Sequence, residues 1–198
     1  MNRDIIARMA VGFVGFVAAS CGAASPISPT IPTAAVAGKP SLPILLAGQS
    51  NALILRDLVW PDAINVVQGG TGIEAWAAQA PLGLELRADA RRGPFAAFVW
   101  WQGEHDAAMT PSAYTAALRA IIADMRAAAG NISVRIVEIN DTPSLMGIKS
   151  ALRVVAADPG NRWISTSDLQ PDPNAPAHLV ASAYPVVAQR IYQSLVMP

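Results

Sequence analysis

Short apolar runs alternate with polar or small-residue segments along residues 41–198, and this alternation predicts the fold. Five runs have the length of strands and are continuous, which is typical of parallel strands that are covered on both faces. These runs are Pro43–Ala47, Ile64–Val67, Ala96–Trp101, Ser133–Ile139 and, with a weaker pattern, Trp163–Thr166.

Three segments between or after the later strands have helical spacing of apolar residues. The first opens at Thr110-Pro111, a cap followed by a proline suited to a first turn, and it stops at Gly130-Asn131. The second is Ser144–Ala157, and the third runs from about Leu179 to Leu195. The pattern therefore predicts an α/β fold in three layers, with helices on both faces of a central parallel sheet of about five strands.

The N-terminal segment has the features of a targeting signal rather than of a folded element. Arg3 and Arg8 precede the apolar stretch Met9–Ser20, which is too short to span a bilayer comfortably. Cys21, the one cysteine of the chain, follows it. The sequence VAASCG resembles a bacterial lipoprotein signal, in which this cysteine is lipidated. Cleavage near Ala24 and a retained anchor are the alternatives, and each predicts export to the periplasm or cell envelope, or secretion.

Composition divides the chain into three parts and argues against nucleic-acid binding. We interpret residues 1–21 as the signal peptide, 22–40 as a linker rich in proline and alanine, and 41–198 as the folded domain. The formal net charge is zero, so the chain has no basic surplus for binding nucleic acid. Arg87–Gly93 holds three arginines beside an aspartate, and we interpret it as a solvated loop.

Polar residues and glycines follow four of the five predicted strands. They are Gly48-Gln49-Ser50-Asn51, Gly69-Gly70-Thr71-Gly72, Gln102-Gly103-Glu104-His105-Asp106 and, after the fifth strand, Asp168, Asp172 and His178. The carboxyl ends of parallel strands meet at one edge of a sheet, where ligands bind. A hydroxyl, an imidazole, carboxylates and amide donors together are what serine ester hydrolysis requires.

The same blocks resemble a known family. GQSN at 48–51, GGTGIEAW at 69–76, WQGEHD at 101–106 and a late His178 are similar to the SGNH hydrolases, in the branch of sialate O-acetylesterases and carbohydrate esterase family 6. The resemblance covers residues 44 to about 192 and implies a flavodoxin-like sandwich. It implies a serine esterase that removes acetyl or other short acyl groups from carbohydrates and needs no cofactor.

Roles carry over from this resemblance to matching positions. Ser50 would be the nucleophile, and His178 would be the general base. The amide of Ser50, that of Gly69 or Gly70, and the side chain of Gln102 would hold the oxyanion.

One position departs from the family pattern. The family has an aspartate three residues before the histidine, but Ala175 stands there. Asp172 is our first candidate for the acid that orients His178, and Asp168, Glu104 or a Ser–His dyad steered by a backbone carbonyl are the alternatives.

Further residues are candidates for contact with substrate. These are Asn51, Glu104, His105 and Trp76. We interpret residues 52–63 and 77–94 as loops in which specificity would lie. The expected partner is an acylated carbohydrate or another small ester, and membrane contact is expected only through a lipid anchor on Cys21.

Other readings of the same residues are weaker. Residues 70–75 match a dinucleotide fingerprint, but no strand ending in an acidic residue follows. His105, Asp106 and His178 lack a compact spacing for a metal, so no metal site is expected. An α/β-hydrolase would place its nucleophile after several strands, in G-x-S-x-G. A non-catalytic, glycan-binding lipoprotein on the same scaffold is the alternative from another class.

Overall fold

The computed structural model describes residues 40–196. The predicted signal peptide, Cys21 and all of the predicted linker except Pro40 lie outside the described residues. Within residues 40–196, no helix combines the length and the apolar character that a bilayer crossing needs.

A central sheet of five parallel strands has the order β2-β1-β3-β4-β5. The strands are β1 (Ile44–Gly48), β2 (Ile64–Val67), β3 (Ala97–Trp101), β4 (Val134–Val137) and β5 (Asn161–Ile164). All residues of β1, β3 and β4 are buried, as expected for strands that carry helices on both faces. The predicted α/β class and the five-stranded parallel sheet are confirmed.

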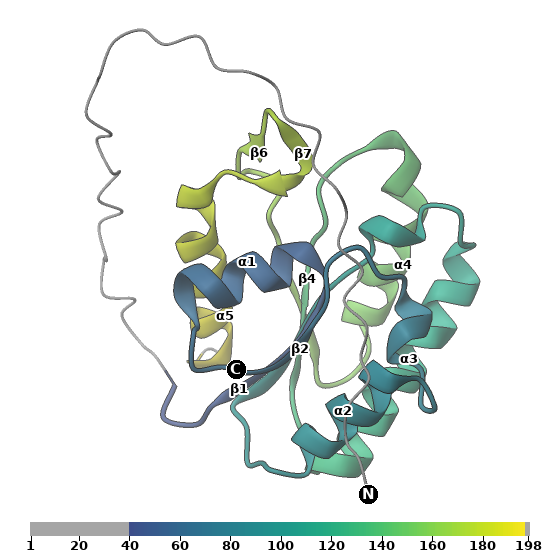
Figure 1. Cartoon of the computed structure of the whole chain (residues 1–198), viewed down its shortest axis with the longest axis vertical. Coiled ribbons are helices and arrows are strands. Elements are labelled where there is room, and N and C mark those ends of the chain that lie inside the picture. The colour runs from purple at the N-terminus through teal and green to yellow at the C-terminus, as the bar shows by residue number, and fades with distance from the viewer. Residues whose placement is uncertain (1–39, 197–198) are drawn as a thin grey trace, which may run out of the picture. The chain divides into compact units, whose positions relative to one another are not determined.

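Within residues 40–196, five α-helices cover the sheet in two layers (Figure 1). They are α1 (Ser50–Val59), α2 (Pro81–Ala90), α3 (Pro111–Ala129), α4 (Met146–Ala156) and α5 (Tyr184–Val196). Helices α1 and α5 lie together on one face, and α2, α3 and α4 cover the other. In this described part of the chain, four short 3₁₀ helices connect the elements: η1 (Ile73–Trp76), η2 (Glu104–Asp106), η3 (Pro143–Leu145) and η4 (Ala181–Ala183).

The interpretation of residues 52–63 and 77–94 as loops is wrong, because much of each segment belongs to α1 or α2. The side chains that these helices bury give a weak apolar period. Helix α1 buries Asn51 and Ala52 beside Leu55, while α2 buries Gly83 and Ala90 beside Leu86. Small and polar inward positions hide the helical spacing on which the prediction depended.

The end of the chain also differs from the prediction. An antiparallel hairpin of β6 (Pro171–Asp172) and β7 (Ala175–Leu179) precedes α5, which begins only at Tyr184. The predicted helix from about Leu179 therefore starts five residues too early. In Figure 1 this hairpin lies above α1 and α5.

Gly48 ends β1 in a conformation that favours glycine, with φ of +146°. A Cβ there would lie 2.0 Å from the carbonyl oxygen of Trp101 at the end of β3. The next amide, of Gln49, donates to that same carbonyl oxygen at 3.1 Å. The close approach of β1 to β3 thus requires glycine, and it starts the sharp turn into α1.

Candidate active site

The site lies at the carboxyl ends of β1 and β3, where the chain leaves these neighbouring strands in opposite directions along the sheet. The strand order 2-1-3-4-5 is that of flavodoxin-like folds, in which a crevice opens outside the carboxyl ends of the two strands at the switch point. Gln49 and Ser50 follow β1, and Gln102 and Glu104 follow β3. The strand order therefore brings these residues together at one edge of the sheet, as predicted.

Ser50 and His178 form the central contact. Ser50 is the first residue of α1, and the hydroxyl oxygen Oγ lies 2.8 Å from Nε2 of His178 on β7. The two residues are 128 positions apart, and the β6–β7 hairpin closes that separation. A neutral imidazole in this position can accept the hydroxyl proton, so the pair has the geometry of a nucleophile and its base.

Backbone amides close to Ser50 could hold a developing negative charge. The first amides of a helix have no acceptor within the helix, so the amide of Ser50 is free of the ladder of α1. Gly69 lies beside it, since a Cβ on Gly69 would be 3.9 Å from Cβ of Ser50. Gly70 has φ of +69°, which lets the loop after β2 turn at this point.

Gln102 is fully buried, and its amide group is occupied. Nε2 donates to the carbonyl oxygen of Thr71 at 3.1 Å and to a carboxylate oxygen of Asp106, while Oε1 accepts from the hydroxyl of Tyr114 at 2.8 Å. Both amide hydrogens thus support the loop after β2 in this conformation. Gln102 would have to release Thr71 or Asp106 before it could donate to an oxyanion.

Asp106 joins that same loop to the residues after β3. Its carboxylate accepts from the amide of Ile73 at 3.0 Å as well as from Gln102. Burial raises the pKa of Asp106 above its usual range, although these hydrogen bonds oppose the rise. Asp106 therefore supports the loops that form the site.

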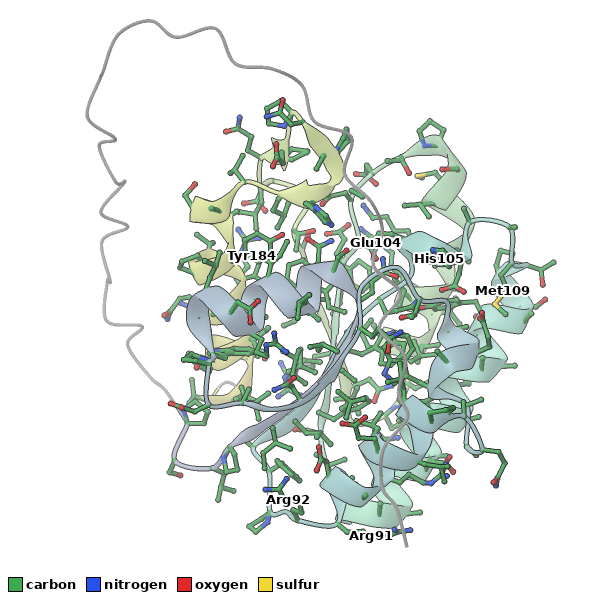
Figure 2. All side chains as sticks on the ribbon, in the orientation of Figure 1. Arg91, Arg92, Glu104, His105, Met109 and Tyr184 are labelled. Atoms are coloured by element: carbon green, nitrogen blue, oxygen red, sulfur yellow. The ribbon has the colours of Figure 1, made fainter. Side chains whose placement is uncertain are left out.

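Glu104 spans the two residues that flank Ser50. Its carboxylate accepts from Nε2 of Gln49 at 2.5 Å and from Nδ2 of Asn51 at 2.6 Å. Burial raises the pKa of Glu104, and the hydrogen bonds of its own backbone, Asn51 and Gln49 oppose that rise. Oδ1 of Asn51 in turn accepts from the hydroxyl of Tyr184 at 2.7 Å, and Figure 2 labels Glu104 and Tyr184 at this end of the sheet.

The candidate acids for His178 have other partners. Asp172 accepts from the amide of Asn174 at 2.8 Å, and Asp168 is paired with Arg190 at 2.6 Å. Glu104 binds the turn around Ser50, as described. Among residues 40–196, the ring of His178 forms its hydrogen bond with Ser50.

The remaining candidates for substrate contact divide between core and rim. Trp76 is 1% exposed and its ring packs edge-on against Trp100, so the structure places it in the core, where it is not available as a sugar platform. His105 is exposed on η2 beside Glu104 (Figure 2). Within the described part of the chain, no three His, Cys, Asp or Glu side chains are grouped closely enough to hold a metal ion.

The arginines of the predicted solvated loop lie away from this site. Arg91 and Arg92 are labelled at the opposite end of the molecule from Glu104 in Figure 2. Arg87 lies on α2 and pairs with Asp124 at 3.0 Å. These side chains therefore contribute no charge to the crevice after β1 and β3.

Two residues of the site were missed by the sequence reasoning. Asn140 follows β4 and donates to the backbone oxygens of Pro176 and His178, each at 2.9 Å. Tyr184 opens α5 and holds Asn51. Asn140 had a signal, because it is a polar residue just past the carboxyl end of a buried strand, which is the rule that found the other residues. Tyr184 is an apolar-looking position of a helix, and nothing in its sequence context indicates a polar role.

Solved structures share this architecture. The chain superposes on a protein from Arabidopsis thaliana with TM-score 0.57 and 17% identity, over 73% of this chain and 65% of that one. A carbohydrate acetylesterase from Xanthomonas citri gives 0.56 and 15%, over 77% and 56%. An acetyl-xylooligosaccharide esterase from Geobacillus gives 0.57 and 11%, over 80% and 95%. The chain thus spans less than two thirds of the first two proteins, and all three likenesses concern the fold. The fold is that of the SGNH hydrolases.

The family follows from the sequence match. The family model described as "Carbohydrate esterase, sialic acid-specific acetylesterase" matches residues 63–197, more than half of the chain. The chain therefore belongs to this family of ester hydrolases, which confirms the resemblance seen in the sequence. The match begins after Ser50, so the nucleophile position depends on the GQSN block and on the contact with His178. No match was found among curated proteins.

Proposed function

We propose that the domain hydrolyses acetyl or other short acyl esters, with carbohydrates as the acylated substrates. The observation that carries the proposal is the 2.8 Å contact between Ser50 Oγ and His178 Nε2 at the switch point of the sheet. Membership of a carbohydrate esterase family supports the substrate class. Two of the similar structures are named as an acetylesterase and an acetyl-xylooligosaccharide esterase, which agrees with a short acyl group.

The proposed reaction has two halves. His178 takes the proton of Ser50 while Oγ attacks the ester carbonyl carbon, and the amides of Ser50 and Gly69 stabilise the oxyanion. The C–O bond of the ester breaks, and the alcohol leaves with the proton from His178. Water, deprotonated by His178, then attacks the acyl carbon. The bond from that carbon to Ser50 Oγ breaks, and His178 returns the proton to Oγ, which releases the acid and free Ser50.

The test of this proposal is turnover of p-nitrophenyl acetate by the mature domain. We expect Ser50→Ala and His178→Ala each to lower kcat/KM by at least about 1,000-fold, because neither half of the pair activates the ester alone. Ser112→Ala, an exposed serine at the start of α3, is the matched control and should keep wild-type activity. Wild-type turnover no faster than that of Ser50→Ala would refute the esterase proposal.

We also propose that the protein is exported and anchored through Cys21. The support is the basic and apolar segment that precedes VAASCG in the sequence. In cell fractionation, Cys21→Ser should move the protein from the membrane fraction to the soluble fraction of the envelope or the medium. An unchanged distribution would contradict lipidation at Cys21.

A further inference from the structure

Three consecutive backbone carbonyls around His178 accept hydrogen bonds from side-chain amides. Nδ2 of Asn140 donates to the oxygens of Pro176 and His178, each at 2.9 Å. Nδ2 of Asn51 donates to the oxygen of Ala177 at 2.8 Å. We propose that Asn140 and Asn51 are positioning residues that orient His178 through its backbone, in place of a carboxylate on the ring. The inference rests on the esterase proposal, in which His178 is the base.

The backbone conformation explains why the family's aspartate position can hold an alanine. Ala175 and His178 lie on the same strand, β7. Residues three apart in a strand point to opposite faces and are separated by about 10 Å. An aspartate at position 175 could not reach the imidazole in this conformation, so Ala175 causes no loss.

The other carboxylates have fixed alternative partners. Arg190 holds both oxygens of Asp168, at 2.7 and 2.6 Å. Asp172 accepts from the amide of Asn174 within its own turn. The two bonds to Arg190 would have to break before Asp168 could turn to His178, and the contact with Asn174 occupies one oxygen of Asp172.

The two asparagines are themselves held firmly. Asn51 is 1% exposed, and its amide also donates to Glu104 while its oxygen accepts from Tyr184. Asn140 is 7% exposed, and both of its amide hydrogens are used on β7. Fixed donors of this kind can set the position of a strand that has little support of its own.

β7 needs that support, because its one strand partner among residues 40–196 is the two-residue β6. A two-stranded hairpin is at best marginally stable alone in water. Anchoring its carbonyls to α1 through Asn51, and to the end of β4 through Asn140, fixes the Cα of His178 relative to Ser50. The imidazole then needs only the Ser50 hydroxyl to select its rotamer.

The first arm of the test removes the donors of Asn140. Asn140→Asp keeps the shape but places a carboxylate against two carbonyl oxygens. We expect kcat on p-nitrophenyl acetate to fall roughly 100-fold with KM changed less than about 2-fold, since misplacement of a reacting group acts on the chemical step. The ratio of variant to wild-type kcat should rise as pH falls, because protonation of the introduced carboxylate returns one donor. Asn131→Asp, an exposed asparagine, is the matched control.

The second arm removes the acids. We call Asn51 and Asn140, with the three carbonyls that they hold, the clamp. Asp172→Asn and Asp168→Asn, both outside the clamp, should keep kcat within about 3-fold of wild type. A loss of 100-fold or more in either variant would overturn the proposal and identify the orienting acid. This arm can refute the proposal even if Asn140→Asp does not fold. Retention of kcat in a folded Asn140→Asp would overturn the proposal as well.

A third readout does not require turnover. In a His105→Gln background, His178 is the one histidine of the chain, and its ring signals can be followed by ¹⁵N NMR. The signals should shift in Asn140→Asp and stay unchanged in Asp172→Asn. The reverse pattern would overturn the clamp. Absence of esterase activity in wild type, with the NMR result as expected, would refute the proposed function and leave the clamp intact.

Discussion

Glu104 connects the two sides of the turn at Ser50 with one carboxyl group. Gln49 and Asn51, the neighbours of Ser50, are both buried, and each donates to a different oxygen of Glu104. A carboxyl group has two oxygens that can accept a hydrogen bond and a glutamine side chain has one, so the carboxyl fits two amide donors better. Placing this group away from water favours its neutral form, and burial accordingly raises its pKa.

Glu104→Gln should therefore cost stability in a way that depends on pH. One of the two donors loses its acceptor, which should lower the free energy of unfolding by about 1–2 kcal/mol. The pKa of Glu104 is raised above 4.5 in the folded protein, so its carboxyl contributes most stability below that value and loses it as pH rises through the raised pKa. The deficit of the variant should be largest near pH 4 and smaller at neutral pH.

Urea unfolding of both proteins across this range measures the difference directly. Glu85→Gln on α2 removes the same charge from an exposed position, and it should change stability little at any pH. A deficit that grows from pH 4 to pH 7 would contradict the raised pKa of Glu104.

At the scale of elements, the sequence predicted the strands and helices whose buried residues are mostly large and apolar. β1 and β3 are continuous apolar runs with all residues buried, and both were found close to their observed bounds. α1 and α2 were missed because they face the sheet with small or polar residues. The β6–β7 hairpin was missed because PDPNAPAH has no alternation of apolar and polar residues.

The candidate site could be predicted as far as the strands that lead into it were recognised. Ser50, Gly69, Gln102 and Glu104 each follow a strand that was recognised, so topology alone placed them at one edge. The contacts between these side chains could not be predicted from the sequence. That Glu104 faces Gln49 and Asn51 depends on side-chain directions that the order of strands does not fix.

At the scale of the whole molecule, a buried ionic group connects the C-terminal half. Glu138 follows β4 and is fully buried, where it accepts from Lys149 of α4 and Arg153 of the same helix. It also accepts from Ser165 Oγ at 2.6 Å and from the amide of Thr166 at 2.7 Å, both just after β5. Burial alone would raise the pKa of Glu138, but the bonds from Lys149, Ser165 and Thr166 lower it from 4.5 to about 2.

Glu138→Gln should therefore destabilise the whole fold at neutral pH, by about 3 kcal/mol, because Lys149 would lose a buried partner. A carboxyl whose pKa is lowered stabilises the fold above its unfolded value, and this contribution disappears as pH falls from 4.5 towards 2. The deficit of Glu138→Gln should thus shrink on acidification, opposite to the trend of Glu104→Gln. Thermal unfolding between pH 7 and pH 2.5, with Glu85→Gln as the exposed control, measures it. A deficit that stays constant below pH 4.5 would show that the ionised carboxylate is not what joins β4, α4 and the segment after β5.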